Sequence, residues 1–483
     1  MAHWKNKKVI IVGLGKSGLA ALQYLAEQGA KLWAIDSNSD AGLLETAKGL
    51  EARGISVTLG QEKLPMEPFD IAILSPGVAM NASAALELKE RNIPCIGELE
   101  LGYQAADCLN IGITGTNGKT TTSQLVRAVL ESGQRKTMLG GDIGVPLCSI
   151  LDQTKALDFL TLEVSSFQLE TTQFFRPSIG ILLNLAPDHQ DRYSSFDDYC
   201  RIKSRLFQNQ QSHDWGIIQS EAMAKLRSLD VQIPGKMVTF SAENRRADVF
   251  LDRGLVISQI KGWSGPLLNM ADCELSGPHN AENIMAALLV GRTLRIPLDA
   301  MKQAIQAFKA PAHRGEWVMD IGGVRYINDS KATNPHATVQ ALRGISGAKP
   351  GEPNVWLIAG GDDKGLQYHD LGPIISQKVK GAFLIGQSRE RLRAAWSLFA
   401  PCQLCDDLVE AIGSVASKAL PSDVVLLSPA CSSLDMFRNF EERGEVFRNV
   451  VTRINASGSS VGTSEQAQNV VVDHPEVARS DPR

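Results

Sequence analysis

One glycine-rich turn in the sequence has the residue types and spacing of a phosphate-binding loop. An apolar run, Ile111–Thr114, leads into Gly-Thr-Asn-Gly-Lys-Thr at 115–120, and helical spacing follows at Ser123–Glu131. Glycines let successive backbone N–H groups face one anion, the lysine adds positive charge, and a threonine hydroxyl can bind Mg²⁺. We therefore predict a nucleoside triphosphate here, although the glycines are closer together than the usual four-residue spacing. The residues expected at the ATP phosphates are Gly115, Thr116, Asn117, Gly118, Lys119, Thr120 and Thr121.

Two later apolar segments end in side chains that suit a metal site. Phe159–Leu162 runs directly into Glu163, and Ile179–Leu183 runs into a polar stretch that contains Asp188 and His189. The carboxyl ends of parallel strands meet at one edge of a sheet, and a carboxylate there, beside a phosphate loop, is a common ligand of Mg²⁺. We expect Glu163 to bind the metal, with a surface ion pair as the alternative, and His189 to belong to the same site.

The N-terminal segment contains a second glycine-rich turn. Residues 9–18 have the pattern of a strand followed by Gly-Leu-Gly-Lys-Ser-Gly, and a later strand, Leu32–Ile35, ends in Asp36. This pattern is typical of a dinucleotide site, with a phosphate at the helix N-terminus and the carboxylate accepting from a sugar or base. A third strand, Ile71–Leu74, ends in the turn Ser75-Pro-Gly77 at the same expected edge. The motif alone specifies its ligand only weakly.

Two polar pairs begin later helices. In Gly277-Pro-His-Asn-Ala-Glu-Asn, Asn280 and Asn283 lie three apart on one helical face. Their amides suit an adenine edge or a ribose, and ordinary N-capping is an equally good interpretation. Ser194 and Ser195 predict the cap of another helix, with Asp197 and Asp198 in its first turn. By its position alone, Lys203 on that helix is expected to be a solvated lysine.

The C-terminal part alternates strand and helix patterns. We predict a hairpin at Trp317–Ile327, with a glycine pair at its turn, and further strands at Val355–Ala359 and Val424–Leu427. Such alternation predicts a parallel sheet. The loops after the first two segments carry Lys331 and Lys364, so we predict a second anion site there.

Length and composition set the overall class. With 483 residues the chain exceeds one ordinary core, and we predict three α/β domains, 1–97, 98–310 and 311–454, with a disordered tail at 455–483. The 49 Lys and Arg residues nearly balance 53 Asp and Glu residues, and a net charge of −4 does not favour nucleic acid or membranes. Eight scattered cysteines indicate free thiols, and Cys402-Gln-Leu-Cys405 lacks the partners of a zinc site. Apolar runs are too short for a membrane span or a signal peptide, so we expect a cytoplasmic protein.

Taken together, these motifs resemble the Mur ligase family over about residues 8–453. The resemblance is carried by Gly-Thr-Asn-Gly-Lys-Thr at 115–120, Glu163-Val-Ser-Ser-Phe-Gln-Leu, Asp188-His-Gln-Asp-Arg-Tyr, Gly277-Pro-His-Asn, His313-Arg314, Asp329-Ser-Lys-Ala-Thr, Gly360-Gly-Asp-Asp-Lys and Leu427–Asp435. The last three, with Phe437–Gly444, are similar to the D-glutamate-adding branch of the family. The Asp-Asn-Pro-Arg motif of the diaminopimelate-adding branch is absent from the sequence.

The resemblance implies a Rossmann-like domain for a UDP-sugar, a central P-loop ATPase domain with a mostly parallel sheet, and a Rossmann-like C-terminal domain. The N-terminal glycine-rich turn at 13–18 would then hold the UDP-sugar and not NAD. The residues implied at the UDP-linked substrate are Leu14, Gly15, Lys16, Ser17, Asp36, Ser37, Ser75, Gly77, Asp142 and His189. Further contacts to ATP are implied for Asn280, Asn283, Arg314 and Asp329. D-glutamate would be surrounded by Lys331, Thr333, Lys364, Ser433 and Phe440.

The activity that the resemblance implies is ATP-dependent addition of D-glutamate to UDP-N-acetylmuramoyl-L-alanine in peptidoglycan synthesis, through an acyl phosphate. The catalytic residues would be Lys119, Glu163, His189 and Lys203, and two Mg²⁺ ions would lie at Thr120, Glu163, His189 and Lys203, with the lysine carbamylated by CO₂. A monomer is expected, with hinges near residues 97 and 310. The alternatives are another Mur-type or folylpolyglutamate-type ligase, or an ATP-driven switch for a protein partner.

Two positions depart from the pattern of that family. Asp142 stands where asparagine is common, and it adds negative charge near an anionic substrate. Asp363 stands where glycine is common. The contact implied for Asp142 is therefore less secure than those of its neighbours.

Overall fold

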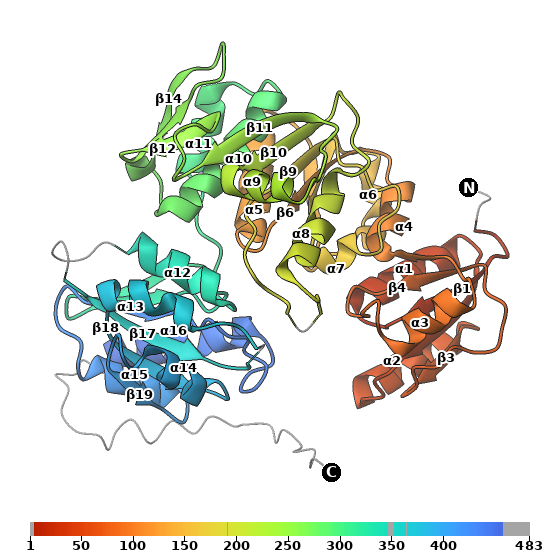
Figure 1. Cartoon of the computed structure of the whole chain (residues 1–483). Coiled ribbons are helices and arrows are strands. Elements are labelled where there is room, and N and C mark those ends of the chain that lie inside the picture. Colours follow the sequence, from red (N-terminus) through yellow and green to blue (C-terminus); the bar gives the residue numbers. More distant parts are fainter. Residues whose placement is uncertain (1–3, 191, 346–351, 364, 457–483) are drawn as a thin grey trace. The chain divides into compact units, whose positions relative to one another are not determined.

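The computed structural model describes residues 4–190, 192–345, 352–363 and 365–456. The chain divides into two compact units, Met1–Lys309 and Ala310–Arg483. Two sheets belong to the first unit and one to the second, each covered by helices (Figure 1). The expected α/β class is confirmed.

The first sheet has five parallel strands in the order β3-β2-β1-β4-β5. Its strands are β1 Lys8–Val12, β2 Lys31–Asp36, β3 Ser56–Leu59, β4 Ile71–Leu74 and β5 Cys95–Gly97, and its helices are α1 Lys16–Glu27, α2 Ala41–Glu51 and α3 Ser83–Glu90. The central strand β1 is buried from Val9 to Val12, which explains its continuous apolar run. The strands predicted here are confirmed.

The second sheet has nine strands in the order β14-β13-β12-β11-β10-β9-β6-β8-β7. Its strands are β6 Leu109–Thr114, β7 Thr137–Gly141, β8 Phe159–Glu163, β9 Ile179–Leu182, β10 Trp215–Gln219, β11 Lys236–Ser241, β12 Val249–Asp252, β13 Leu255–Ser258 and β14 Gly265–Asn269. Only the pairs β12–β13 and β13–β14 are antiparallel, so the sheet is mostly parallel, as expected. Its antiparallel end was not predicted.

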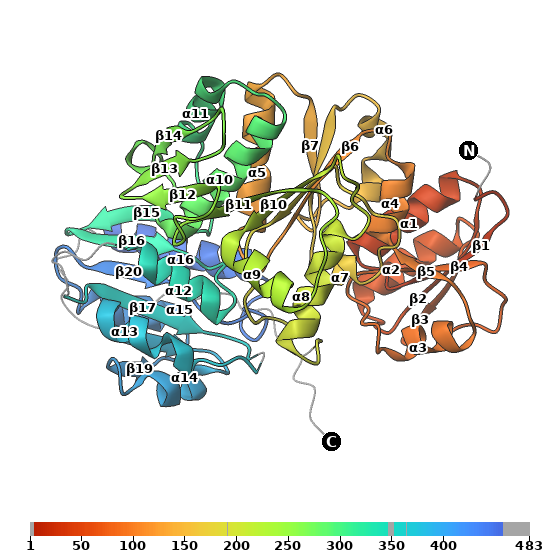
Figure 2. The same cartoon turned by 45° about the horizontal axis from the view of Figure 1, so that its top comes forward.

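Helices cover both faces of this central sheet (Figure 2). The helices of this part of the chain are α4 Glu98–Ala105, which packs on α1 and on β4 and β5 of the first sheet, and α5 Lys119–Ser132, α6 Leu151–Thr154, α7 Ser166–Leu169, α8 Phe196–Ser204, α9 Ser220–Ser228, α10 Pro278–Thr293 and α11 Leu298–Gln306. Helix α10 is buried almost all round from Asn283 to Gly291, which places it inside the first unit, packed on α5. Within the described residues, no helix is long and apolar enough to cross a membrane.

The sheet of the second unit has six strands in the order β15-β16-β20-β17-β18-β19. Its strands are β15 Glu316–Ile321, β16 Val324–Asn328, β17 Val355–Gly360, β18 Val379–Ile385, β19 Cys402–Leu404 and β20 Val424–Leu427, and its helices are α12 Pro335–Gly344, α13 Gly372–Lys378, α14 Arg389–Trp396, α15 Leu408–Ala416 and α16 Phe440–Ala456. The predicted hairpin is β15–β16, with positive φ at Gly322 and Gly323. The first two residues of the expected tail, 455–456, are helical, and 457–483 lie outside the described residues.

Two buried carboxylates dock helix α4 just after the N-terminal sheet. Glu98 and Glu100 are both fully buried. Oε1 of Glu98 accepts a hydrogen bond from the backbone N–H of Cys148 at 2.6 Å, while Glu100 accepts from three successive N–H groups at 173–175. Oε2 of Glu98 has no hydrogen-bond partner among the described residues. Burial raises the pKa of Glu98 to about 7.

We predict that the stability of the Glu98→Gln variant, measured relative to the parent, increases as the pH rises. A carboxyl with a raised folded-state pKa binds its proton in the native state between about pH 4.5 and 7, so its stabilisation is lost across that window. The stability of the variant minus that of the parent should rise by at most about 1.4 kcal/mol per pH unit there. Urea unfolding at several pH values measures it. A constant difference across the window contradicts the prediction.

Candidate active site

The predicted phosphate loop joins β6 to α5. Gly118 has φ 86°, and Lys119 is the first residue of the helix. A side chain at Gly118 would place Cβ 2.5 Å from Oδ1 of Asn283, so glycine is required there. Nζ of Lys119 lies 3.4 Å from the backbone oxygens of both Gly115 and Thr116. The loop thus combines a helix N-terminus and a cation, as an anion site does.

An asparagine that the sequence analysis did not identify holds this loop. Oδ1 of Asn184 accepts from the N–H of Asn117 at 2.9 Å, and Nδ2 of Asn184 donates to the carbonyl of Asn117 at 3.0 Å. The carbonyl of Asn184 also accepts from the N–H of Thr116 at 3.1 Å. Its position directly after an apolar strand was the available signal. The Asn184 side chain therefore fixes the backbone of the loop at Asn117.

The structure brings together two of the residues predicted to bind metal. The hydroxyl of Thr120 donates to Oε2 of Glu163 at 2.8 Å. Glu163 is only 4% exposed, so a surface ion pair is the wrong interpretation. The backbone N–H of Asp142 donates to the carbonyl of Glu163 at 2.8 Å, while the Asp142 side chain is exposed. A carboxylate and a hydroxyl beside a phosphate loop are oxygen ligands of the kind that Mg²⁺ accepts.

Lys203 is buried, and the expectation of a solvated lysine is wrong. Its side chain is 1% exposed, and Nζ donates to the carbonyl of Gly115 at 2.9 Å. Burial, followed by the nearby charge of Lys119, lowers the pKa of Lys203 well below its usual value, against the opposite effect of Asp188 and Asp142. The helix therefore points an amine at the phosphate loop.

Tyr199, which the sequence analysis did not identify, lies between Thr116 of the phosphate loop and Lys203. Its hydroxyl lies 3.1 Å from Oγ1 of Thr116, and its ring lies 4.8 Å from Nζ of Lys203. The His189 ring is 6.4 Å away, centroid to centroid. His189 itself has a positive φ of 52° and packs on Phe167 at 4.6 Å. The four-residue spacing of Tyr199 and Lys203 on α8 was the signal in the sequence.

The two predicted asparagines of α10 do not cap it. The cap residue is Gly277, which has no side chain to form a capping bond. Nδ2 of Asn280 donates to the carbonyl of Ser276. Asn283 is 4% exposed, donates to Asn280, and accepts from the hydroxyl of Thr122 at 3.1 Å. The N-capping interpretation is wrong, and Asn283 lies against the phosphate loop.

Eight of the residues predicted at the UDP-linked substrate share one edge of the first sheet, whereas Asp142 and His189 follow strands of the central sheet. Leu14 to Ser17 occupy the turn after β1 and the start of α1, Asp36 ends β2 and Ser37 follows it, and Ser75 and Gly77 follow β4. These three strands are neighbours. Both oxygens of Asp36 accept backbone N–H groups, from Leu14 at 2.7 Å and Asn38 at 2.9 Å. Asp36 therefore shapes the glycine-rich turn.

Arg192 ties that edge to the central sheet. Its guanidinium donates to the carbonyls of Pro76 and Val78 at 2.9 and 3.0 Å. It also forms a fork with Glu170 at 3.0 and 2.6 Å and stacks 4.1 Å from the Phe167 ring. The side chain is only 10% exposed. One arginine thus joins the Ser75–Val78 turn to the loop that carries His189.

In the second unit, a buried arginine gathers the loops that follow the central strands. Arg443 is 1% exposed and donates to the carbonyls of Ser330, Cys431 and Ser432. It also donates to Oγ of Ser330 at 3.0 Å. Burial lowers its pKa to about 10. Arg443 belongs to the Phe437–Gly444 motif, but only the fold reveals that it holds these loops in position.

The predicted residues of this unit converge in part. Asp329 accepts from the N–H of Gly315 and the hydroxyl of Ser428, and burial raises its pKa to about 7. Nζ of Lys331 lies 3.7 Å from the centre of the Phe440 ring. The same unit contains Arg314, Thr333 and Ser433. Lys364 lies outside the described residues.

Asp363, the second departure noted in the sequence, has partners of its own. Its carboxylate pairs with Arg391 at 2.5 Å and accepts from the Tyr368 hydroxyl at 3.2 Å. Arg391 also donates to the carbonyl of Leu366. The extra charge at this position is therefore neutralised inside the unit.

The fold and the cradle of lysine, threonine and buried carboxylate define an α/β enzyme that binds nucleotide phosphates. Three family models match successive segments: Mur ligase MurD-like N-terminal domain at 7–97, Mur ligase middle domain at 113–291, and Mur ligase glutamate ligase domain at 313–431.

Full-length relatives carry the name UDP-N-acetylmuramoylalanine–D-glutamate ligase. That of Acidobacterium capsulatum is 37% identical, covering 92% of this chain and 96% of the relative, and that of Koribacter versatilis is 36% identical, covering 93% and 98%. The chain belongs to the Mur ligase family.

Solved structures agree on the fold. MurF ligase from Thermotoga maritima in complex with ADP aligns with a TM-score of 0.59 at 16% identity, covering 94% of this chain and 96% of that one. A pseudomurein peptide ligase type C from Methanothermus fervidus aligns with a TM-score of 0.58 at 19% identity, covering 93% of this chain and 100% of that one. At such identities the likeness concerns the fold alone.

We predict that Arg192→Lys weakens binding of UDP about tenfold, while binding of ADP changes less than about threefold. Lysine cannot form the fork with Glu170 and also reach both carbonyls, and hydrogen bonds of charged groups are each worth about 1.5–3 kcal/mol. Isothermal titration with each nucleotide measures this. The matched control is Arg127→Lys on the exposed face of α5. Unchanged UDP affinity would mean that the Ser75–Val78 turn is held without Arg192.

Proposed function

We propose that this chain is the D-glutamate-adding ligase of peptidoglycan synthesis, which joins D-glutamate to UDP-N-acetylmuramoyl-L-alanine with cleavage of ATP to ADP and phosphate. The observation that carries the proposal is similarity over more than nine-tenths of the chain to ligases of that name. The MurD-like match at residues 7–97 supports the choice of the UDP-linked substrate within the family.

The chemistry explains why a phosphate loop is required. A carboxylate does not form an amide with an amine in neutral water, so it must first be activated. A carboxylate oxygen of the L-alanyl group attacks the γ-phosphorus, the bond to ADP breaks, and an acyl phosphate forms. The amine nitrogen of D-glutamate then attacks the acyl carbon, phosphate departs with the bonding electrons, and the nitrogen loses a proton.

The attacking carboxylate and the phosphate repel each other, and residues around the loop reduce this repulsion. Lys119 and the N-terminus of α5 offset negative charge on the transferred phosphoryl group. Thr120 and Glu163 fit Mg²⁺, which when bound would neutralise further charge there.

Lys203 suits the role of a carbamate. Burial lowers the pKa of Lys203, which favours the neutral amine, and a neutral amine can attack CO₂ and lose a proton. The product is a carboxylate-like group beside Gly115, where a lysine cation would repel Mg²⁺. His189 and Asp142 would face the UDP-linked substrate. The exposed carboxylate of Asp142 would weaken the binding of this anionic substrate.

The second unit would bind D-glutamate. Lys331 over Phe440, together with Ser433 on a loop that Arg443 holds, offers a cation and donors for its carboxylates. Asn280, Asn283, Arg314 and Asp329 remain the proposed further contacts to ATP. Hinges near residues 97 and 310 would allow the two acids to meet, and their orientation can contribute about 7–11 kcal/mol of the barrier.

We expect phosphate release that requires both UDP-N-acetylmuramoyl-L-alanine and D-glutamate. A coupled phosphate assay should show at least about tenfold less release with L-glutamate or meso-diaminopimelate, because each 1.4 kcal/mol of lost transition-state binding is tenfold. ATP hydrolysis that ignores both acids would support a switch instead of a ligase. Activity with diaminopimelate would favour another branch of the family.

We also expect activity to depend on CO₂. Enzyme prepared in CO₂-free buffer should lose most of its activity and regain it with bicarbonate, while Lys203→Arg, which cannot form the carbamate, should be inactive under both conditions. Lys225→Gln, a half-buried lysine of α9 that pairs with Asp197, is the matched control and should respond as the parent does. Full activity of Lys203→Ala, with an unmodified amine in the parent crystal structure under bicarbonate, contradicts the carbamate.

A further inference from the structure

A pocket of about 580 Å³ lies at the edge of the central sheet opposite the phosphate loop. It opens at the amino ends of β6, β8, β9 and β10, whereas the phosphate loop, Glu163 and His189 follow the carboxyl ends of the same strands. Its size is within the usual range of about 300–1,000 Å³ for small-molecule sites. None of the residues assigned above to ATP, UDP or D-glutamate lines it.

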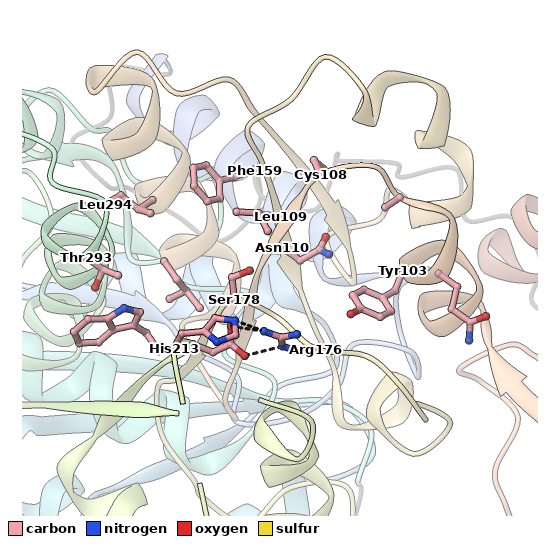
Figure 3. A pocket seen from close by; sticks show the side chains of 15 residues that line it. Tyr103, Cys108, Leu109, Asn110, Phe159, Arg176, Ser178, His213, Thr293 and Leu294 are labelled. Carbon is pink, nitrogen blue, oxygen red and sulfur yellow. Dashed lines mark hydrogen bonds and ion pairs between the residues drawn. The ribbon is translucent and has the colours of Figure 1, made fainter. Parts of the chain in front are cut away.

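One wall of this pocket carries a fixed arginine (Figure 3). Nε and Nη2 of Arg176 donate to the carboxylate of Asp214 at 2.7 and 3.2 Å, and Nη2 lies 2.6 Å from Nε2 of His213. Asp214 is only 3% exposed, and it also accepts from the N–H of Gln211. The third nitrogen, Nη1, makes no hydrogen bond to the part of the chain that the structure describes. The ion pair orients the guanidinium and leaves Nη1 available.

Asn110 is a second group without a partner. It is 5% exposed in the central strand β6, where a parallel sheet normally has an apolar side chain. Its Oδ1 has no hydrogen-bond partner among the described residues. Its Nδ2 and the hydroxyls of Ser178 and Thr293 likewise donate to no described acceptor. The buried Oδ1 of Asn110 is an acceptor and calls for a donor from a ligand or ordered water, whereas Nδ2 and the two half-buried hydroxyls offer donors in the lining of the pocket.

The remaining lining is apolar and aromatic. Figure 3 shows Phe159 and Leu294 on the side opposite Arg176 and His213, with Ser178 and Asn110 between them. Leu109 is 56% exposed although it begins the central strand. Trp215 completes the wall. The pocket therefore has an apolar side that suits a flat ring and a polar side that carries a guanidinium, an amide and two hydroxyls.

We propose that this pocket binds a small aromatic carboxylate, with the ring against Phe159, Leu109 and Leu294 and the carboxylate accepting hydrogen bonds from Arg176 and Asn110. Arginine suits a planar anion of this kind. The one acidic side chain of the lining, Asp214, is already engaged by Arg176 and does not oppose the anion. The proposal is independent of the ligase assignment.

The test uses 1-naphthoate as the probe and 1-naphthalenemethanol as its neutral counterpart. Calorimetric titration is done on the full chain saturated with ADP and UDP, so that nucleotide sites are occupied. We expect saturable naphthoate binding with Kd below about 1 mM and at least tenfold weaker binding of the alcohol. Absence of saturable binding, equal binding of both compounds, or a co-crystal structure with only water beside Asn110 overturns the proposal.

Pocket-filling variants locate the binding. Leu109→Trp should abolish it, whereas Leu255→Trp, a change of another exposed leucine that begins a strand of the same sheet, should leave it unaltered. Thermal melting verifies that each variant folds, and Thr293→Trp, at the end of α10, replaces Leu109→Trp if that variant does not melt cooperatively. Parent-like naphthoate binding by a folded pocket-filling variant contradicts the proposed site.

Discussion

The parallel register of β6 with β8 and β9 is the constraint on which the site of the first unit depends. Ile113 pairs with Glu163 and Thr114 pairs with Leu182, so the three strands end at one level. The phosphate loop, the carboxylate that Thr120 contacts, and Asn184 therefore emerge side by side. A shift of register by one residue would turn Glu163 to the other face of the sheet.

Burial of charged side chains costs free energy, and specific hydrogen-bond partners offset that cost in this chain. Arg192 and Glu170 satisfy each other, while two backbone carbonyls take the remaining donors of the arginine. Arg443 is surrounded by carbonyl oxygens. Lys203 instead donates to the carbonyl of Gly115 and the hydroxyl of Thr114, and burial followed by the charge of Lys119 lowers its pKa. Buried ionisable groups with shifted pKa values gather at functional sites, and here the lysine faces the phosphate loop.

The two edges of the central sheet carry different chemistry. Its carboxyl edge presents a helix N-terminus and backbone N–H groups, which suit anions, and open α/β sheets generally bind their ligands at this edge. Its amino edge has side-chain donors and aromatic rings around Arg176. The same strands connect both edges, so a ligand at one edge contacts the elements that hold the other.

Much of the fold and the site was predictable because the information is local. The run before Gly115, the glycines, and the order of lysine and threonine specify strand, turn and helix within a few residues. The same holds for β1, β4, β9 and the β15–β16 hairpin. What only the tertiary structure decided involves partners far apart in the chain: the burial of Lys203, the packing of Asn283 against Gly118, the bridge from Arg192 to Pro76, and the role of Arg443. A residue's type states which bonds it can form, but its burial and its partners depend on which distant strands and helices pack around it.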